Sequence, residues 1–90
     1  MKRQQIILIT GIAGFIGYHL AKKLIKSDYF LIGIDNMNSY YDPKLKEERL
    51  KDIYKSNQNY SKNLIFKKCD LDDIIAIENI FLKYRPRIVI

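Results

Sequence analysis

The feature that most constrains this chain is a short segment in which glycine recurs at every third position. Gly11, Gly14 and Gly17 are three of the four glycines among the 90 residues. They follow the apolar run Ile6–Ile9, whose β-branched residues and short length are typical of a strand buried on both faces. The sequence therefore predicts that a buried strand leads into a glycine-rich turn.

The rest of the chain alternates between helical and extended patterns. A first helix, ending near Ser27 and Asp28, is predicted from apolar residues at helical spacing: Ile16, Leu20 and Leu24 on one stripe, with Ala21 and Ile25 beside it. Apolar runs predict strands at 30–34, 64–69 and 88–90, and further helical patterns predict helices at 44–55 and 73–84. Polar segments separate these elements.

Aspartates stand where they can cap two of the predicted helices. Asp42 comes directly before Pro43, which suits a first helical position because its missing N–H costs nothing there. Asp72 is expected to cap the last helix. That helix has apolar residues at helical spacing, with two more flanking them: Ile74, Ile77 and Phe81 on one face, and Ile80 and Tyr84 beside it.

This order of elements predicts an α/β fold. Strand, helix and strand within the first 36 residues form a βαβ unit. We expect a Rossmann-like, doubly wound parallel sheet, of which about four strands and three helices, the first half, are present. Ile88–Ile90 begins a strand that should be buried, whereas domain termini usually lie at the surface. We therefore expect residues 1–90 to be the N-terminal part of a domain that is truncated within its fourth strand.

Composition excludes several classes of protein. Cys69 is the single cysteine, so the chain cannot form an intramolecular disulfide. With His19 as the single histidine, it cannot build a Cys2His2 zinc site either, and no metal site is predicted. No apolar run reaches the roughly 18 to 20 residues that a transmembrane helix needs. We expect a reduced protein with no membrane partner.

The N-terminus permits a second reading, as a secretory leader. The basic start, Met1–Arg3, precedes the largely apolar stretch 6–21, which is the leader pattern. Against this reading, glycines recur through the stretch and His19 interrupts it, while Lys22 and Lys23 stand where a cleavage site would be expected. A cytoplasmic location is therefore predicted.

The basic charge suggests nucleic-acid binding as an alternative function. The formal net charge is +6 and the isoelectric point is about 9.5. The lysines are, however, scattered over the predicted helix faces, and no helix-turn-helix or RNA-binding signature is present. We expect no nucleic-acid partner. A non-catalytic remnant of a longer reading frame is a further alternative.

The glycine-rich turn is suited to bind a pyrophosphate. Gly11 permits the tight turn after the strand, Gly14 lets a phosphate approach the backbone, and Gly17 lets the helix pack closely on the sheet. The helix N-terminus adds amide donors and a positive dipole end. Asp35 follows Gly17 by 18 residues, at the end of the second predicted strand. Its carboxylate can accept both ribose hydroxyls of an adenosine and would repel a 2′-phosphate, which predicts NAD rather than NADP.

Two segments carry a family resemblance. Thr10-Gly-Ile-Ala-Gly-Phe-Ile-Gly17 resembles the cofactor motif of the extended short-chain dehydrogenases/reductases, the nucleotide-sugar epimerases and dehydratases. Gly33-Ile-Asp-Asn-Met-Asn-Ser-Tyr-Tyr-Asp-Pro-Lys-Leu-Lys-Glu-Glu-Arg-Leu50 resembles the matching stretch of UDP-glucuronate 4-epimerases. The resemblance covers essentially the whole chain. It departs at Cys69, where family members usually have glycine.

The resemblance implies a set of NAD contacts. Gly11, Gly14 and Gly17, with the backbone of Phe15 and Ile16, would hold the pyrophosphate. The other implied contacts are Asp35 and Asn36 at the adenine ribose, Asn38 and Ser39 at the ribose or a phosphate, and Asp70 at the adenine amino group with the Leu71 backbone beside it. Simpler readings remain open, since Asp70 could merely end a strand, and Asn38 and Ser39 could be ordinary turn residues.

The resemblance also implies a reaction. In this family a Tyr-x-x-x-Lys helix and NAD oxidise a UDP-sugar at C4, and the 4-keto sugar is then reduced on its other face. Tyr18 and Lys22 match that spacing formally, but they lie within the phosphate motif, so the match is interpreted as accidental. No catalytic residue is predicted, the substrate domain is expected to be absent, and the chain alone is expected to be inactive. The complete enzyme is a candidate homodimer. Other nucleotide-sugar epimerases and dehydratases share the same features.

Overall fold

The computed structural model describes residues 5–27, 29–38, 43–56 and 62–90. Strands and helices alternate along this part of the chain, as the sequence predicts. Their bounds are β1 (Gln5–Thr10), α1 (Phe15–Leu24), β2 (Tyr29–Asp35), α2 (Pro43–Ser56), β3 (Leu64–Lys68), α3 (Ile74–Tyr84) and β4 (Ile88–Val89). Each predicted element is present, and most ends agree within two residues; α1 ends three residues early.

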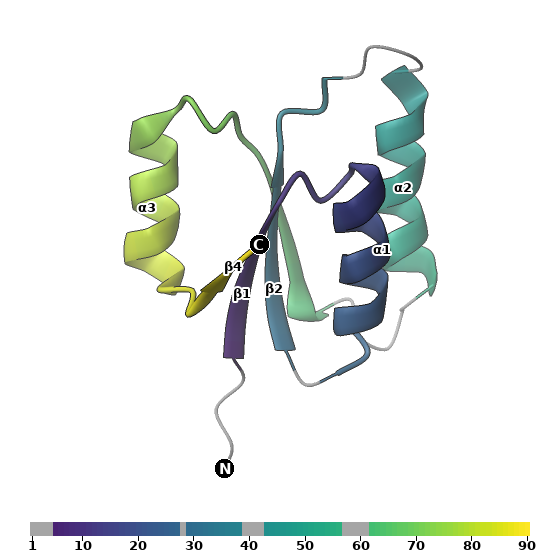
Figure 1. The fold of residues 1–90 in the computed structure, drawn as a ribbon, viewed down its shortest axis with the longest axis horizontal. Helices are drawn as coiled ribbons and strands as arrows, with labels where there is room; N and C mark the ends of the chain where they lie inside the picture. Colours follow the sequence, from purple (N-terminus) through teal and green to yellow (C-terminus); the bar gives the residue numbers. More distant parts are fainter. Residues whose placement is uncertain (1–4, 28, 39–42, 57–61) are drawn as a thin grey trace.

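The strands form one parallel sheet with the order β3-β2-β1-β4. The chain thus adds strands on one side of β1 and then crosses to the other side for β4. Helices α1 and α2 cover one face of the sheet and α3 covers the other (Figure 1). The predicted α/β class and doubly wound, Rossmann-like arrangement are confirmed. In such sheets, ligands bind beyond the carboxyl ends of the strands, near the point where the strand order reverses.

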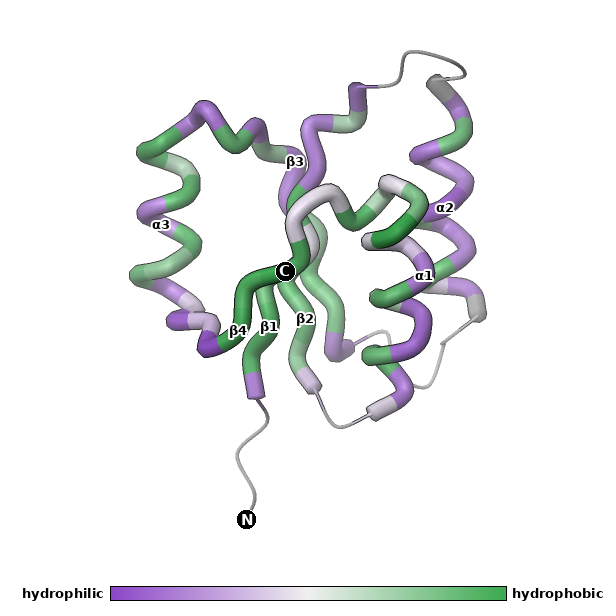
Figure 2. Tube along the Cα trace, viewed as in Figure 1, coloured by the Kyte–Doolittle hydropathy of each residue, from purple (hydrophilic) through white to green (hydrophobic). Residues whose placement is uncertain are grey.

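Alternate residues of the central strand supply two cores. Ile7 and Ile9 of β1 pack with residues of α1 and α2, whereas Leu8 packs toward α3 with Ile32 and Ile34 of β2. The hydropathy colouring shows the same division, with strands that are largely hydrophobic and helices that alternate between hydrophobic and hydrophilic residues (Figure 2). Burial on both faces explains why the strands read as continuous apolar runs.

The predicted buried face of α1 needs correction. Ile16 is 76% exposed, while the buried positions in the helix are Gly17 and Ala21. The helix approaches the sheet on its small-residue side, because the absent side chain of Gly17 permits contact between the backbones there. Ile25 is also buried but lies just beyond the helix, which ends at Leu24 rather than near Ser27.

The predicted apolar face of α3 is also shifted. Ile74 is 68% exposed and Phe81 38% exposed. The buried face centres on Ile80, with Ile77 and Tyr84 packed against the same core. The helix is apolar over most of its circumference, so periodicity alone could not choose between neighbouring stripes.

Asp73, not Asp72, caps α3. The Asp73 Oδ1 atom accepts a hydrogen bond from the Ala76 amide at 3.1 Å. The backbone amide of Asp72 instead donates to Asp70 Oδ1 at 3.2 Å, within the turn that leads into the helix. An N-cap side chain accepts from an amide two or three residues later, and here the acceptor is Asp73, one residue later than predicted. The other predicted cap, Asp42, lies outside the described residues.

Asp73→Ala is expected to lower the free energy of unfolding by about 1 kcal/mol, because an amide in the first turn of α3 loses its acceptor. The matched control, Asp72→Ala, is expected to change it by less than about 0.5 kcal/mol. Urea unfolding followed by circular dichroism measures both. A larger loss for Asp72→Ala than for Asp73→Ala would contradict this assignment of the cap.

Candidate nucleotide-binding site

The glycine-rich turn links β1 to α1 at the carboxyl edge of the sheet. Gly11 has a φ of 65°, in the left-handed region that glycine adopts without strain. The Gly14 amide donates to the Gly11 carbonyl at 2.9 Å, and the Ile12 amide donates to the Ile34 carbonyl of β2 at 3.1 Å. Ile12 and Ala13 are fully buried. The turn is therefore fixed to both β1 and β2.

Gly17 brings the first turn of α1 against this segment. A Cβ atom at Gly17 would lie 2.3 Å from the Gly11 carbonyl oxygen and 3.0 Å from Ile12 Cα. Real Cβ atoms essentially never approach another atom as closely as 2.3 Å, and both neighbours are backbone. The packing role that the sequence predicts for Gly17 is confirmed.

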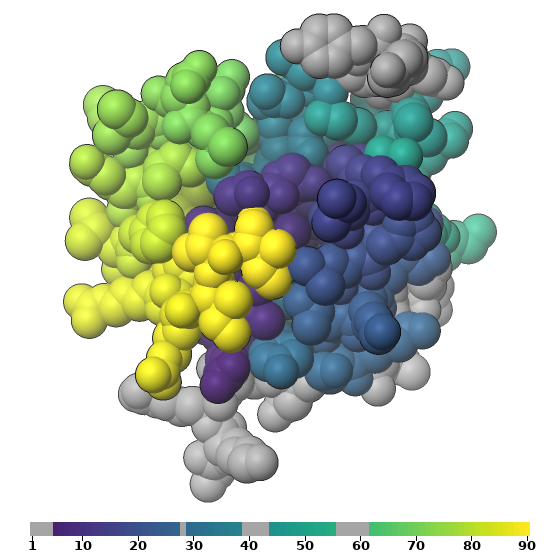
Figure 3. All heavy atoms as spheres, viewed as in Figure 1, coloured from purple at the N-terminus to yellow at the C-terminus, as the bar shows by residue number. Residues whose placement is uncertain are grey.

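The C-terminal residues lie beside this segment (Figure 3), and the Thr10 amide donates to the Ile90 carbonyl at 2.8 Å.

The start of α1 presents donors that an anion can use. Gly14 is the N-cap, and the first helical hydrogen bond runs from the Tyr18 amide to the Gly14 carbonyl at 2.9 Å. The amides of Phe15, Ile16 and Gly17 precede it and have no acceptor within the helix by geometry. The side chains of Phe15 and Ile16 are 67% and 76% exposed. This end of the helix dipole is positive and favours a phosphate.

Asp35 ends β2 with a buried carboxylate. The residue is only 5% exposed. Its Oδ2 atom accepts from the Ala13 amide at 3.0 Å, and its Oδ1 atom accepts from the Met37 amide at 2.7 Å and from Lys46 Nζ at 2.9 Å. The carboxylate thus connects the glycine-rich turn, the segment after β2 and helix α2.

Lys46 is a site residue that sequence reasoning missed. It lies in the first turn of α2, where the positive end of the helix dipole disfavours a cation. A lysine at this unfavourable position was the one sequence signal that pointed to a role for Lys46. A carboxylate has about four acceptor positions, and Asp35 already uses three of them. About one acceptor position of Asp35 therefore remains open to a ligand, and the Lys46 ammonium beside it is a further donor.

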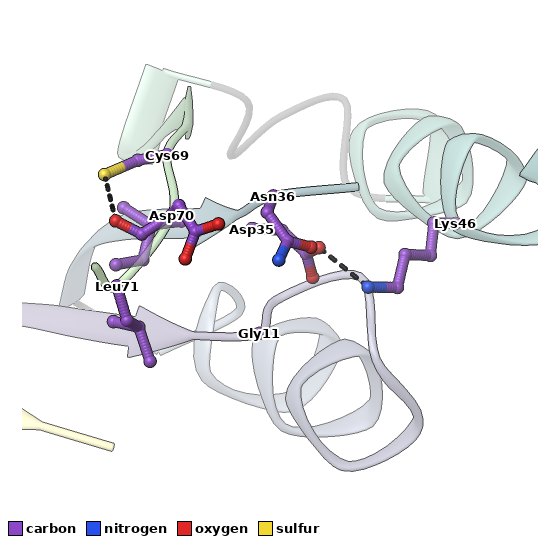
Figure 4. Close-up of a pocket in the computed structure, with 8 residues that line it drawn as sticks. Gly11, Asp35, Asn36, Lys46, Cys69, Asp70 and Leu71 are labelled. Atoms are coloured by element: carbon purple, nitrogen blue, oxygen red, sulfur yellow. Dashed lines mark hydrogen bonds and ion pairs between the residues drawn. The ribbon is translucent and has the colours of Figure 1, made fainter. Parts of the chain in front are cut away.

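A cavity of about 160 Å³ brings together several of the predicted residues (Figure 4). It is lined by Gly11, Ile34, Asp35, Asn36, Lys46, Cys69, Asp70 and Leu71. These residues come from the ends of β1, β2 and β3 and from α2. The structure therefore brings together five residues that the sequence assigned to one cofactor: Gly11, Asp35, Asn36, Asp70 and Leu71. Phe15, Ile16, Gly14 and Gly17 lie on the adjoining turn and helix.

Asn38 lines a neighbouring cavity with Asn36 and Asp70. Its amide donates to Asn36 Oδ1 at 2.9 Å, which is the local turn contact of an Asx turn. Asn38 thus has the turn role that the sequence left open, at a place next to the main cavity. Ser39, predicted beside it, lies outside the described residues.

Cys69 directly follows β3 and lines the cavity. Its amide donates to the Asp35 carbonyl at 3.0 Å, and its thiol donates to the Asp70 carbonyl at 3.3 Å. Burial, followed by the charges of Asp73 and Asp70, raises the pKa of the Cys69 thiol. The thiol is therefore protonated at neutral pH and is a poor nucleophile.

Tyr18 and Lys22, the formal Tyr-x-x-x-Lys pair, join α1 to α2 and do not line the cavity. The Tyr18 hydroxyl donates to Asp52 of α2, and Lys22 Nζ lies 2.9 Å from the same carboxylate oxygen. The hydrogen bond to Asp52, and then that to Tyr18, raise the pKa of Lys22. Both side chains are committed to contact between helices.

Two sequence relatives match most of this chain. Protein CapI of Staphylococcus aureus is 46% identical over 84 residues, covering 93% of this chain and 23% of the relative. A UDP-glucuronate 4-epimerase of Thermodesulfobacterium geofontis is 37% identical over 83 residues, covering 92% and 24%. The chain thus spans about a quarter of the length of these curated relatives.

A solved structure shows the same fold. It is a UDP-glucose 4-epimerase of Thermotoga maritima with UDP-glucose, which matches with a TM-score of 0.67 and 33% identity over 94% of this chain and 23% of that one. None of the described helices combines the length and apolar content needed to cross a membrane. The family model for GDP-mannose 4,6 dehydratase matches residues 8–90. The chain belongs to this family, the nucleotide-sugar epimerases and dehydratases of the extended short-chain dehydrogenase/reductase type.

Proposed function

We propose that this chain is the NAD-binding part of a nucleotide-sugar epimerase of the UDP-glucuronate 4-epimerase type. The observation that carries the proposal is the contact between the buried Asp35 carboxylate and the glycine-rich turn at the carboxyl edge of the sheet. A dinucleotide needs a pyrophosphate cradle next to a ribose acceptor, and the glycine-rich turn and Asp35 are suited to these two roles. Relatives with this activity support the substrate class.

The residues divide among the parts of the cofactor. The turn from Gly11 to Gly17, with the amides of Phe15 and Ile16, would hold the pyrophosphate. Asp35, Asn36 and Lys46 would bind the adenine ribose, with Asn38 and Ser39 beside them, and Asp70 and the Leu71 backbone would meet the adenine. Bound NAD would be the acceptor of the hydride from the C4–H bond of the sugar. This chain's own part is to bind and orient the dinucleotide.

The catalytic step belongs to residues beyond this sequence. The relatives are about four times as long as the segment they share with this chain. We therefore assign the Tyr-x-x-x-Lys pair, the UDP-sugar site and any homodimer contact to the remainder of the complete enzyme, in the cytoplasm, and expect residues 1–90 alone to be inactive.

Isothermal titration calorimetry with NAD and NADP tests the cofactor assignment. NAD is expected to bind at least about tenfold more tightly than NADP, because Asp35 repels a 2′-phosphate. Asp35→Ala is expected to remove that preference, and the exposed Lys55→Ala, at the far end of α2, is expected to keep it. Preference for NADP by the unmodified protein would contradict the assignment of Asp35.

The family model supports a second candidate, a dehydratase that acts on a GDP-sugar. Incubation of the complete enzyme with UDP-glucuronate and with GDP-mannose separates the two. Conversion of UDP-glucuronate to its C4 epimer supports the first proposal, and formation of a 4-keto-6-deoxy sugar from GDP-mannose supports the second. Salt-sensitive binding to DNA without a response to NAD would instead support the nucleic-acid alternative.

A further inference from the structure

Helix α2 contacts the end of β2, the glycine-rich turn and α1 through polar side chains at every third position. Lys46 Nζ lies 2.9 Å from Asp35 Oδ1. One turn later, Arg49 Nη1 donates to the Ala13 carbonyl at 3.0 Å. Asp52, one turn further on, accepts from the Tyr18 hydroxyl and from Lys22 Nζ. The middle contact reaches the turn itself.

Arg49 and Asp35 hold Ala13 at its two backbone polar groups. The Ala13 amide donates to Asp35 Oδ2 at 3.0 Å, and the Ala13 carbonyl accepts from Arg49 at 3.0 Å. Ala13 is fully buried, so water cannot replace these partners without opening the turn. The carbonyl of Ala13 and the amide of Gly14 share one peptide plane, and that amide donates to Gly11. The plane is thus fixed at both edges.

We propose that Arg49 is a positioning residue for the pyrophosphate site. By holding the Ala13 carbonyl, it sets the orientation of the peptide that leads into Gly14 and so the direction of the Phe15 and Ile16 amides. This inference rests on the proposed function, in which those amides bind the pyrophosphate. Arg49 itself need not touch the cofactor.

The guanidinium is held in place from its other side. Arg49 Cζ lies 5.9 Å from the centroid of the Tyr18 ring, within the range of a cation–π contact. The Tyr18 hydroxyl is fixed by Asp52. A planar guanidinium can stack on a ring and donate in its own plane at the same time, which a lysine ammonium cannot do. Arg49→Lys therefore keeps the charge but loses the geometry.

This difference separates positioning from simple electrostatic attraction. If Arg49 acted only as a positive charge near the phosphates, Arg49→Lys would bind NAD as the unmodified protein does. If Arg49 acts through the Ala13 carbonyl, Arg49→Lys and Arg49→Gln are both impaired. Both variants must then bind ligands with a pyrophosphate more weakly, while their affinity for ligands without one stays unchanged.

Calorimetry with NAD, ADP and adenosine on the purified protein tests the proposal. Both variants are expected to bind NAD and ADP about tenfold more weakly, since one charge-assisted hydrogen bond to the turn is lost, and to bind adenosine within about twofold of the unmodified protein. Lys51→Gln, an exposed change on the same helix, is the control and is expected to leave all three affinities unchanged. The ratio of ADP to adenosine affinity is measured within each folded sample, so it does not depend on lost stability.

The backbone amide resonances give a second readout without any ligand. In ¹⁵N correlation spectra, Arg49→Lys is expected to shift the amides of Gly14, Phe15 and Ile16, whereas Lys51→Gln is not. Equal NAD affinity in Arg49→Lys, an equal loss for all three ligands, or unmoved resonances at these amides would overturn the inference. Failure of the unmodified protein to bind either NAD or ADP would instead overturn the proposed function, and the resonances would still report whether Arg49 orients the turn.

Discussion

Substitution of Gly17 by alanine is expected to lower the free energy of unfolding by about 2 kcal/mol. The new Cβ atom would lie 2.3 Å from the carbonyl oxygen and 2.9 Å from the carbonyl carbon of Gly11. Because these are backbone atoms of a turn tied to two strands, they cannot rotate away as a side chain would. Overpacking of this kind costs about 1–3 kcal/mol, and the better helix propensity of alanine offsets up to about 1 kcal/mol of it.

Gly14→Ala is the matched comparison for Gly17→Ala. A Cβ atom at Gly14 would lie 3.2 Å from the Gly11 carbonyl oxygen, so a small local shift accommodates it. Urea unfolding should show a smaller loss, below about 1 kcal/mol, for Gly14→Ala. For NAD affinity we expect the reverse order, with the larger loss for Gly14→Ala, because in the proposed function the pyrophosphate approaches the backbone at Gly14. Unchanged stability in Gly17→Ala would mean that α1 does not rest on the turn as described.

Removal of the Asp35 carboxylate is expected to be the most costly change to the site. Asp35→Ala leaves the Lys46 ammonium without its partner and the buried Ala13 amide without its acceptor. The side chain of Asp35 is 2% exposed and that of Lys46 20% exposed, so water screens the pair only partly. Loss of one member of such a pair costs about 3 kcal/mol, and NAD binding is expected to fall at least tenfold.

A double-mutant cycle with Lys46→Met identifies the source of this loss. If the uncompensated ammonium dominates, Asp35→Ala combined with Lys46→Met should be more stable than the sum of the two single changes implies, by about 1 kcal/mol or more. Urea unfolding of the four proteins measures this coupling. Simple additivity would indicate that the lost hydrogen bonds to the Ala13 and Met37 amides carry the cost instead.

The strands and the turn were predictable because their signals are local. Apolar runs of four or five residues fit strands that are buried on both faces, and three glycines marked the turn. The buried face of α1 was not predictable from hydrophobicity. The large Ile16 points to solvent, whereas the small Gly17 marks the contact with the sheet. Close backbone packing selects for the absence of a side chain, which an apolar stripe cannot reveal.

The position of a predicted residue could be foreseen where it lies at the end of a strand or just after one. Asp35 ends β2 and Asp70 lies two residues after β3, and they line one cavity because parallel strands end at the same edge of the sheet. Lys46 and Arg49 were missed because lysines and arginines on a helix usually belong to a solvated face. Their roles depend on how α2 sits against the turn, which is a contact between segments more than 30 positions apart in the case of Arg49 and Ala13.

The three hydrogen bonds of Asp35 also limit how this protein can evolve. In dinucleotide-binding folds a carboxylate binds the ribose hydroxyls of NAD, whereas a nearby arginine accommodates the 2′-phosphate of NADP. Replacement of that carboxylate is a simple change when the residue touches only the ligand. Here the carboxylate that we propose for this role also holds the turn and helix α2. A lineage that replaced it first would pass through an unstable intermediate. Lys46 would have to lose its charge before that replacement or together with it. Coenzyme preference and folding stability could therefore not change independently.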